Sequence, residues 1–262
     1  MTQTQTQLDF KTAPGHQVLA AAGKKALRPG GYAATDRLFA WANFQPGETV
    51  LELAASFGYS AIALAQRYKV RVVGVEKNPD SVARAQVNVA AAGLTQQVQI
   101  IQGDIFHLEQ ISEQFDYVLA EAILTMQSDV GKAKILTGIC DRLKLRGQFL
   151  SHELRVEGPN TDMICRELST TIRVNAAPLS TDGWITLVHQ AGFTVENHNI
   201  GSMALLNPGR IAQEEGVPTL LTIAWNMLTR PDIRQRILSM RETFGRYRSD
   251  LGYVVLTARK GN

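Results

Sequence analysis

The chain has 262 residues, of which 45% are hydrophobic and 19% charged, and its formal net charge is +3 at pH 7. These values are typical of a soluble globular protein of one large or two small domains, and the mild, dispersed basic charge does not imply nucleic-acid binding. Only two cysteines occur, no apolar run reaches the roughly 20 residues of a membrane span, and the polar N-terminus lacks a signal-peptide core, so we expect a cytoplasmic protein without disulfides or a metal site.

Residues 1–45 are predicted to form an N-terminal helical cover segment. Residues 1–15, with their alternating Thr and Gln, bury little surface, and we expect them to be loosely ordered. A short helix over 16–25 and a turn at Arg28-Pro29-Gly30-Gly31 follow. Thr35 or Asp36 is predicted to cap a second helix, and Pro46-Gly47 ends the segment.

From residue 46 onward the pattern alternates between strand and helix. The predicted strands are 50–53, 70–75, 98–101, 115–119 and 146–152, the last of them after a turn at Arg146-Gly147. The clearest helices run from Asn78-Pro79 to about residue 92 and from 129 to about 143. Strands separated by helix-length segments are typical of an α/β fold whose parallel sheet is covered on both faces.

After residue 155 the pattern loosens into helical insertions at about 155–185 and 201–248. Helices are predicted over 160–174, 181–191 and most of 207–248, with breaks at Pro218 and Pro231. Strands are predicted over 193–200 and 252–257. An insertion of about forty residues between the last two strands is typical of a lid or substrate-binding element, which we favour over the alternative of a homodimer surface.

The stretch VLELAASFGYSAIALA, residues 50–65, combines a short strand, a turn of small residues and an apolar helix. Small residues let a ligand lie against the backbone, and a helix N-terminus offers free N–H donors. By itself this stretch fits either a nucleotide-type cofactor site or a tightly packed corner without a ligand.

Four acidic residues lie at or just after the ends of successive predicted strands: Glu52, Glu76, Asp104 and Glu121. Ligands of open α/β sheets bind beyond the carboxyl ends of the strands. Glu76 is placed to accept hydrogen bonds from two ribose hydroxyls, and Asp104 from an amino group. The alternative for each acid is a helix cap or a solvated side chain.

Four stretches in this order resemble the class I S-adenosylmethionine-dependent methyltransferases: VLELAASFGYSAIALA, VVGVEKNPDSVARAQVNVAAAGL, VQIIQGDIF and FDYVLAEAILTM. LKLRGQFLSHE and AGFTVENHNI resemble the family's fifth and sixth strands. The resemblance implies a Rossmann-like, seven-stranded, mostly parallel sheet with helices on both faces, plus helical cover elements, with residues 46–262 as the methyltransferase domain. The RPGG segment and the helical C-terminal part resemble small-molecule methyltransferases of the ubiquinone/menaquinone and arsenite type.

The resemblance implies a set of S-adenosylmethionine contacts, residue by residue. The turn and its flanks would pass beneath the methionine and ribose, Glu76 would hold the ribose, and Asp104 the adenine amino group. The implied cofactor-binding residues are Glu52, Ala54, Ser56, Gly58, Tyr59, Glu76, Lys77, Asp104, Ile105 and Ala120. Ala54 and Ser56 stand where the family has glycines, and they keep the close approach provided that their φ values are negative.

The implied reaction is transfer of a methyl group to a small organic acceptor by in-line displacement, which needs positioning more than acid–base chemistry. If the acceptor is a hydroxyl or a protonated amine, the candidate bases are Glu121, His152 and Tyr32, with His16 as a further one. The alternatives are a hydrogen-bonded structural role for His152 and lid packing for Tyr32. No metal site is predicted.

Other acceptors and functions fit the sequence less well. Two cysteines do not supply the thiolate set for arsenic methylation, and AEAI replaces the Asn/Asp-Pro-Pro-aromatic motif of base methylation, so we disfavour nucleic acid as a partner. Five arginines between residues 234 and 248 form either a solvated helix face or a surface for an anionic substrate or membrane headgroup. A nicotinamide-dependent oxidoreductase and a non-catalytic cofactor-binding protein of methyltransferase descent are the alternative functions.

Overall fold

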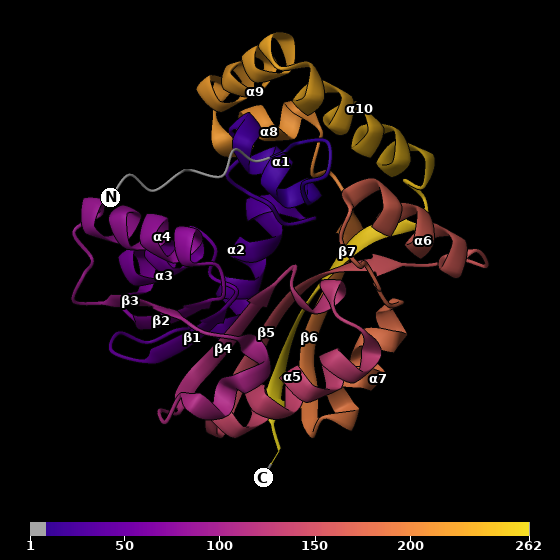
Figure 1. Ribbon diagram of the computed structural model, residues 1–262. Helices are drawn as coiled ribbons and strands as arrows, with labels where there is room; N and C mark the ends of the chain where they lie inside the picture. The colour runs from indigo at the N-terminus through magenta and orange to yellow at the C-terminus, as the bar shows by residue number, and fades with distance from the viewer. Residues whose placement is uncertain (1–8, 262) are drawn as a thin grey trace.

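A seven-stranded sheet of order β3-β2-β1-β4-β5-β7-β6 forms the centre of the molecule (Figure 1). The computed structural model describes residues 9–261, so the expectation for residues 1–8 lies outside the described part. The strands are β1 (Thr49–Leu53), β2 (Arg71–Glu76), β3 (Val98–Gln102), β4 (Phe115–Glu121), β5 (Leu143–Val156), β6 (Phe193–Ser202) and β7 (Leu251–Lys260). Only β7 runs antiparallel to its neighbours, β5 and β6. The predicted seven-stranded, mostly parallel, Rossmann-like sheet is confirmed.

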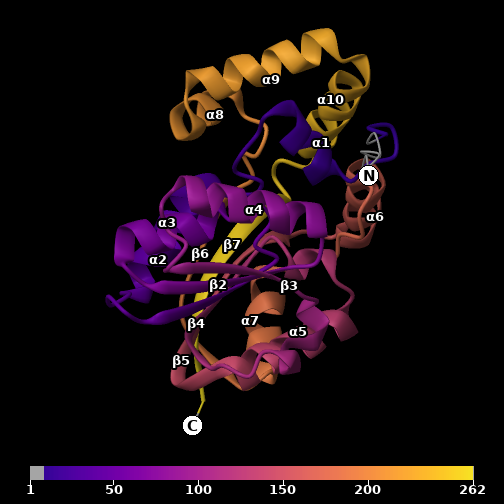
Figure 2. The ribbon, with the colours of Figure 1, turned by 60° about the vertical axis from the view of Figure 1, so that its left-hand side comes forward.

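Helices cover both faces of this sheet (Figure 2). One face packs against α2 (Gly31–Ala42), α3 (Tyr59–Tyr68) and α4 (Pro79–Ala91), and the other against α5 (Asp129–Arg142) and α7 (Thr181–Gln190). Successive strand residues point to opposite faces, so Val50 belongs to the first apolar cluster and Leu51 to the second. The same alternation directs Glu52 toward α2 and α3.

A third apolar cluster joins five further helices into a cap over one end of the sheet (Figures 1 and 2). These helices are α1 (Gly15–Ala22), α6 (Thr161–Ile172), α8 (Pro208–Glu215), α9 (Val217–Thr229) and α10 (Pro231–Arg246). Two short 3-10 helices, η1 (Ile105–Gln110) and η2 (Leu124–Met126), follow β3 and β4. No helix within residues 9–261 is long and apolar enough to span a membrane.

Several predicted boundaries are wrong for physical reasons. Helix α2 begins four residues before Thr35, with Gly30 as its N-cap, because the Thr35 hydroxyl bonds a carboxylate instead of capping. The predicted break at Pro218 falls at Gly216, since proline fits the first turn of a helix. Strand β5 follows α5 directly, and Arg146 takes a φ of +61° inside the strand, opposite a shift in the β4–β5 register.

Candidate active site at the carboxyl ends of the strands

The turn after β1 has a left-handed backbone at three positions. Ala54, Ser56 and Gly58 have φ values of +51°, +50° and +77°. The condition of negative φ at Ala54 and Ser56 is therefore not met: the chain keeps a glycine-type turn although it carries side chains there. Such a conformation costs roughly 1–2 kcal/mol for an L-residue other than glycine.

Three residues other than glycine at this end of the sheet have a left-handed backbone that no helix end explains. Seven residues other than glycine within 9–261 have positive φ. Asn43, Lys69 and Arg173 end helices, and Arg146 lies in the irregular part of β5. The other three are Ala54, Ser56 and Ala122, which follow β1 or β4. Backbone strain that is kept in this way is typical of functional sites.

Glu76 and Asp104 lie at neighbouring strand ends, as the sequence predicts. Glu76 fixes the turn: its Oε2 accepts from the Ser56 N–H at 2.9 Å and its Oε1 from the Asn78 N–H at 2.8 Å. Asp104 accepts from Lys77 Nζ at 2.9 Å and from the Phe106 N–H at 3.0 Å. The Lys77 hydrogen bond, followed by that from Phe106, lowers the pKa of Asp104.

Glu52 is buried beneath the turn with an unused acceptor. Glu52 is only 5% exposed, and its Oε2 has no hydrogen-bond partner among the described residues. Burial, and then the charge of Glu121, raises the pKa of Glu52 to about 8. A buried carboxyl with one unpartnered oxygen in a cavity is suited to a cationic ligand.

Glu121 is held in a buried network with the RPGG segment. Arg28 Nη1 lies 2.5 Å from its Oε2 and 2.6 Å from its Oε1. The hydroxyls of Thr35 and Ser60 donate to the same carboxylate at 2.5 Å and 2.7 Å. Burial alone would raise the pKa of Glu121, but the Arg28 charge and contacts from His152 and Thr35 hold it well below its usual range. The Glu121 carboxylate is therefore ionised, and its oxygens are occupied by hydrogen bonds within this network.

His152 is fully buried beside Glu121, and both ring nitrogens are engaged. Its Nε2 accepts from the Gly30 N–H at 3.0 Å, which leaves the proton on Nδ1, 3.3 Å from Thr35 Oγ1. Burial lowers the pKa of His152 against the opposing effect of Glu121, so the ring is neutral. A Cβ at position 30 would lie 2.8 Å from this nitrogen, so only glycine fits there.

Helix α8 holds the N-terminal loop from the cap side through two adjacent acids. Glu214 accepts from the Tyr32 N–H at 2.9 Å. Glu215 accepts from Lys24 Nζ at 2.5 Å and from the Lys25 N–H at 2.7 Å. The Tyr32 ring packs 5.3 Å from the Arg28 guanidinium, and burial raises the pKa of its phenol. Hydrogen bonds thus join the N-terminal loop both to the sheet and to helix α8 of the cap.

A buried carboxylate on β5 fixes the turn that follows Ala122. Glu153 accepts from the N–H groups of Leu124 and Thr125 at 3.0 Å and 2.9 Å, and from the Thr125 hydroxyl at 2.6 Å. Burial raises the pKa of Glu153 to about 7, although these hydrogen bonds oppose the rise.

Two cavities meet at the N-terminal loop. The first is polar and is lined by the β1 turn together with Arg28, Glu52, Tyr59, Ser60 and Glu121. The second is apolar and lies beneath the cap, with walls that include Leu19, Leu168, Ile172, Met203, Met240 and Phe244. Leu27 lines both cavities, and the consecutive residues Glu121 and Ala122 each line one of them. The arrangement can hold a polar and an apolar ligand side by side.

His16 is the titratable side chain in the wall of the apolar cavity. The residue is solvent-accessible. Desolvation by the neighbouring protein atoms nevertheless lowers the pKa of the imidazole, and the negative charge of Glu76 opposes this shift. The ring is therefore largely neutral at pH 7.

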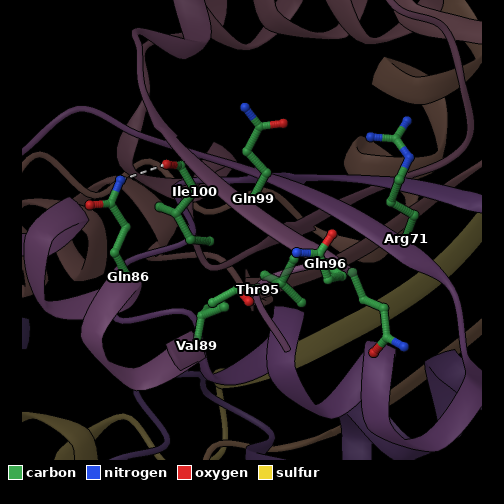
Figure 3. A pocket seen from close by; sticks show the side chains of 9 residues that line it. Arg71, Gln86, Val89, Thr95, Gln96, Gln99 and Ile100 are labelled. Atoms are coloured by element: carbon green, nitrogen blue, oxygen red, sulfur yellow. Dashed lines mark hydrogen bonds between the residues drawn. The ribbon is translucent and has the colours of Figure 1, made fainter. Parts of the chain in front are cut away.

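A separate polar groove runs along the edge strand β3 (Figure 3). None of the acidic or left-handed residues described above lines it. Gln86 donates to the Ile100 carbonyl at 3.1 Å in its wall. Its charged residue, Arg71, forms an ion pair with Glu113.

The structure brings most of the predicted residues together. Glu52, Ala54, Ser56, Tyr59 and Glu121 line one cavity, with Glu76, Lys77 and Asp104 at the adjacent strand ends. Gly58 caps α3 and Ile105 begins η1, whereas Ala120 is buried in the core against α5 and α7.

The sequence interpretation missed the contributions of several residues, namely Arg28, Thr35, Ser60, Ala122 and Glu153. Arg28 stands in the RPGG segment, whose arginine was a usable signal. Thr35 was marked only as a helix cap, and no pattern marked Ser60, Ala122 or Glu153.

Comparison with known proteins agrees with this geometry. A family model described as a methyltransferase domain matches residues 44–203. A Haemophilus influenzae protein described as uncharacterized is 32% identical over 250 residues, which are 95% of this chain and 99% of that protein.

Solved structures share the fold at low sequence identity. A SAM-dependent methyltransferase from Geobacter sulfurreducens, in complex with S-adenosyl-L-homocysteine, has a TM-score of 0.71 at 17% identity and covers 94% of this chain and 98% of its own. Phosphoethanolamine N-methyltransferase 2 of Haemonchus contortus, in complex with S-adenosyl-L-methionine, has a TM-score of 0.73 at 16% identity, covering 98% of this chain and 59% of its own.

Proposed function

The chain belongs to the methyltransferase domain family, whose cofactor is S-adenosylmethionine, and on this premise we propose that it methylates a small apolar organic molecule. The observation that carries the proposal is the pair of adjoining cavities, one polar with a buried free carboxyl and one apolar, that share Leu27. Transfer between two bound molecules requires adjacent sites of different character. The family match favours this reaction over the nicotinamide-dependent alternative.

The residues of the polar cavity fit the cofactor. The unpartnered Oε2 of Glu52 suits the positively charged methionine portion, and the turn after β1 keeps the left-handed backbone conformation that glycines would adopt there. We propose that Arg28, which keeps N–H groups beyond those used by Glu121, Thr35 and Ser60, binds the carboxylate of that portion. Glu76 and Asp104 are proposed to hold the ribose and the adenine amino group.

The apolar cavity is proposed to hold the acceptor and to exclude water from it. When bound, S-adenosylmethionine supplies an activated sulfonium methyl group, so positioning is the main demand on the protein. The cavity walls are aliphatic, thioether and aromatic, and they favour an uncharged, apolar molecule.

We assign Glu121 and His152 positioning roles instead of base catalysis. Glu121 is ion-paired with Arg28, and both nitrogens of His152 are engaged, so neither is free to take a proton from an acceptor. Tyr32 retains its phenol proton because its pKa is raised. His16 lines the acceptor cavity with a neutral ring, and we propose that it accepts the proton of an acceptor hydroxyl.

Calorimetry with S-adenosylmethionine and S-adenosylhomocysteine, followed by a labelled-methyl assay on apolar phenols and quinols, tests this function. The variant Val174→Trp fills the acceptor cavity, and Val87→Trp places the same side chain on an exposed face of α4. We expect Val174→Trp to keep cofactor binding and to lose at least tenfold in transfer rate, while Val87→Trp keeps both. Absence of cofactor binding would rule out the function, and an unchanged rate in Val174→Trp would rule out the acceptor site.

A further inference from the structure

Helix α9 exposes a stripe of large apolar side chains. Val217, Leu221, Trp225 and Leu228 are between 57% and 69% exposed. Their spacings of four, four and three residues place them on one face of the helix. Figure 2 shows α9 at the outer edge of the cap, farthest from the sheet. A row of large apolar side chains exposed along one helix face is typical of a binding surface.

The opposite face of α9 supplies the packing of the helix. Thr219 and Ile223 are buried, and Ile223 belongs to the apolar cluster of the cap. Helix α9 carries no charged residue. Burial within this chain therefore explains the inner face and leaves the outer face without a role in the fold.

Exposed arginines lie on the neighbouring helix α10 and just after it. Arg234 and Arg241 are exposed on α10, with the exposed Leu238 between them, and Arg248 follows the helix. Within residues 9–261 none of these three arginines forms an ion pair, whereas Arg246 pairs with Glu167 and Glu242. Apolar side chains beside unpaired basic ones are the pattern by which a helix lies in the interface of an anionic membrane.

We propose that the outer face of α9 and α10 docks on an anionic lipid bilayer, with the α9 stripe among the acyl chains and the arginines on the headgroups. A second copy of the chain fits this face less well. Helices of 13 and 16 residues are about 20 Å and 24 Å long and about 10 Å wide, so their two faces together cover on the order of 400 Å², against about 800 Å² per partner in a standard interface. The unpaired arginines of two copies would also repel each other.

Helix α10 contributes residues both to the docking surface and to the wall of the apolar cavity. Met240 and Phe244 of α10 line that cavity, while Leu238 and Arg241 face outward. The docked orientation thus presents the cap to a source of apolar molecules. Docking itself does not depend on the proposed methyl transfer, because it is measured without cofactor or acceptor.

Flotation of the full chain with vesicles of 30% phosphatidylglycerol in phosphatidylcholine, compared with phosphatidylcholine alone, tests the proposal. We expect binding to the anionic vesicles that is at least tenfold stronger and that weakens with salt. Leu221→Glu/Trp225→Glu should reduce this binding at least tenfold, and Arg234→Glu/Arg241→Glu should remove the preference for anionic lipid. Val130→Glu, on an exposed site of α5 and outside α9 and α10, should bind like the parent chain.

Circular dichroism and thermal unfolding establish that the variants are folded, and light scattering gives the oligomeric state. The proposal is wrong if the parent chain does not float, or if the folded Leu221→Glu/Trp225→Glu variant floats as well as the parent. It is also wrong if the parent is a dimer that this variant separates without any vesicle binding, which would identify the stripe as an interface between copies.

Discussion

Arg28 and Glu121 form a buried ion pair that joins the N-terminal loop to the end of strand β4. The two residues lie 93 positions apart in the chain, and Thr35, Ser60 and His152 surround their contact. Because the pair also lines the polar cavity, the same contact supports the fold of the loop and the chemistry of the site.

Breaking this pair should destabilise the protein strongly. Glu121→Gln keeps the shape of the side chain but leaves the buried Arg28 charge without a partner, which typically costs about 3–5 kcal/mol of unfolding free energy. Urea denaturation measures the loss. As a control, Asp36→Asn removes the acid of the half-exposed Arg67–Asp36 pair and should cost less than about 1 kcal/mol. Similar losses in the two variants would contradict the importance of burial.

Cofactor binding should release a proton from Glu52. The pKa of this carboxyl is about 8 in the free protein, and a bound cation favours its ionised form. We therefore expect the affinity for S-adenosylmethionine to rise from pH 6.5 to 8 and then to level off. Calorimetry in two buffers of different ionisation enthalpy detects the released proton.

Glu52→Gln provides the matched variant for this experiment. It should bind the cofactor more weakly by about 1.5–3 kcal/mol at pH 8.5, the range of a charged hydrogen bond, and with little dependence on pH. If the parent chain binds equally well across this range, Glu52 is not the group that meets the cationic portion.

The stability of the cofactor-free protein should fall between pH 6.5 and 8. The pKa values of Glu52 and Glu153, about 8 and about 7, are above the ordinary value of 4.5. The unfolded state therefore binds fewer protons than the folded state, and the unfolding free energy decreases as the pH rises until the folded groups ionise too. His16 and His152, whose pKa values are lowered, act mainly below this window.

Urea denaturation at several pH values measures this slope, which is at most about 1.4 kcal/mol per pH unit for each group. Glu52→Gln should flatten it. A parent protein that becomes more stable over the same window would refute the raised pKa values.

Replacing Ala54 by glycine should stabilise the fold. The left-handed conformation costs roughly 1–2 kcal/mol for alanine, while glycine adds about 0.4–1 kcal/mol of unfolded-state entropy. We expect a net gain of up to about 1 kcal/mol in thermal or urea unfolding. Ala83→Gly, at an exposed position within α4, should instead lose about 1 kcal/mol. Equal losses at both positions would show that Ala54 is not strained.

Local patterns predicted the sheet well because period-two apolar runs and helix caps are local signals. Asn78 caps α4 as predicted, with its side chain accepting from the N–H groups of Asp80 and Ser81. The start of α2 was mispredicted, since Thr35 is a plausible cap by sequence. In the structure its hydroxyl is taken by Glu121, 86 positions away.

The location of the site was predictable from local sequence patterns, but the chemical states of its residues were not. Glu52, Glu76, Asp104 and Glu121 were found because each lies at or just beyond the carboxyl end of a strand, and parallel strands end at one edge of the sheet. Their chemical states were not predictable, because the pairing of Glu121 with Arg28 and the isolation of Glu52 Oε2 depend on contacts between distant segments. The left-handed φ values of Ala54 and Ser56 are likewise invisible in residue types that disfavour them.

The wall of the apolar cavity is assembled from separate parts of the chain: α1, α6 and α10, together with residues that follow β4 and β6. Exchange of a single contiguous segment with a relative would thus replace only one side of the cavity and leave mismatched surfaces. Chimeras that aim to transfer acceptor choice must change residues on several of these elements together. Divergence of acceptor choice among relatives is accordingly expected to proceed by scattered point substitutions within the cap, not by recombination of a lid cassette.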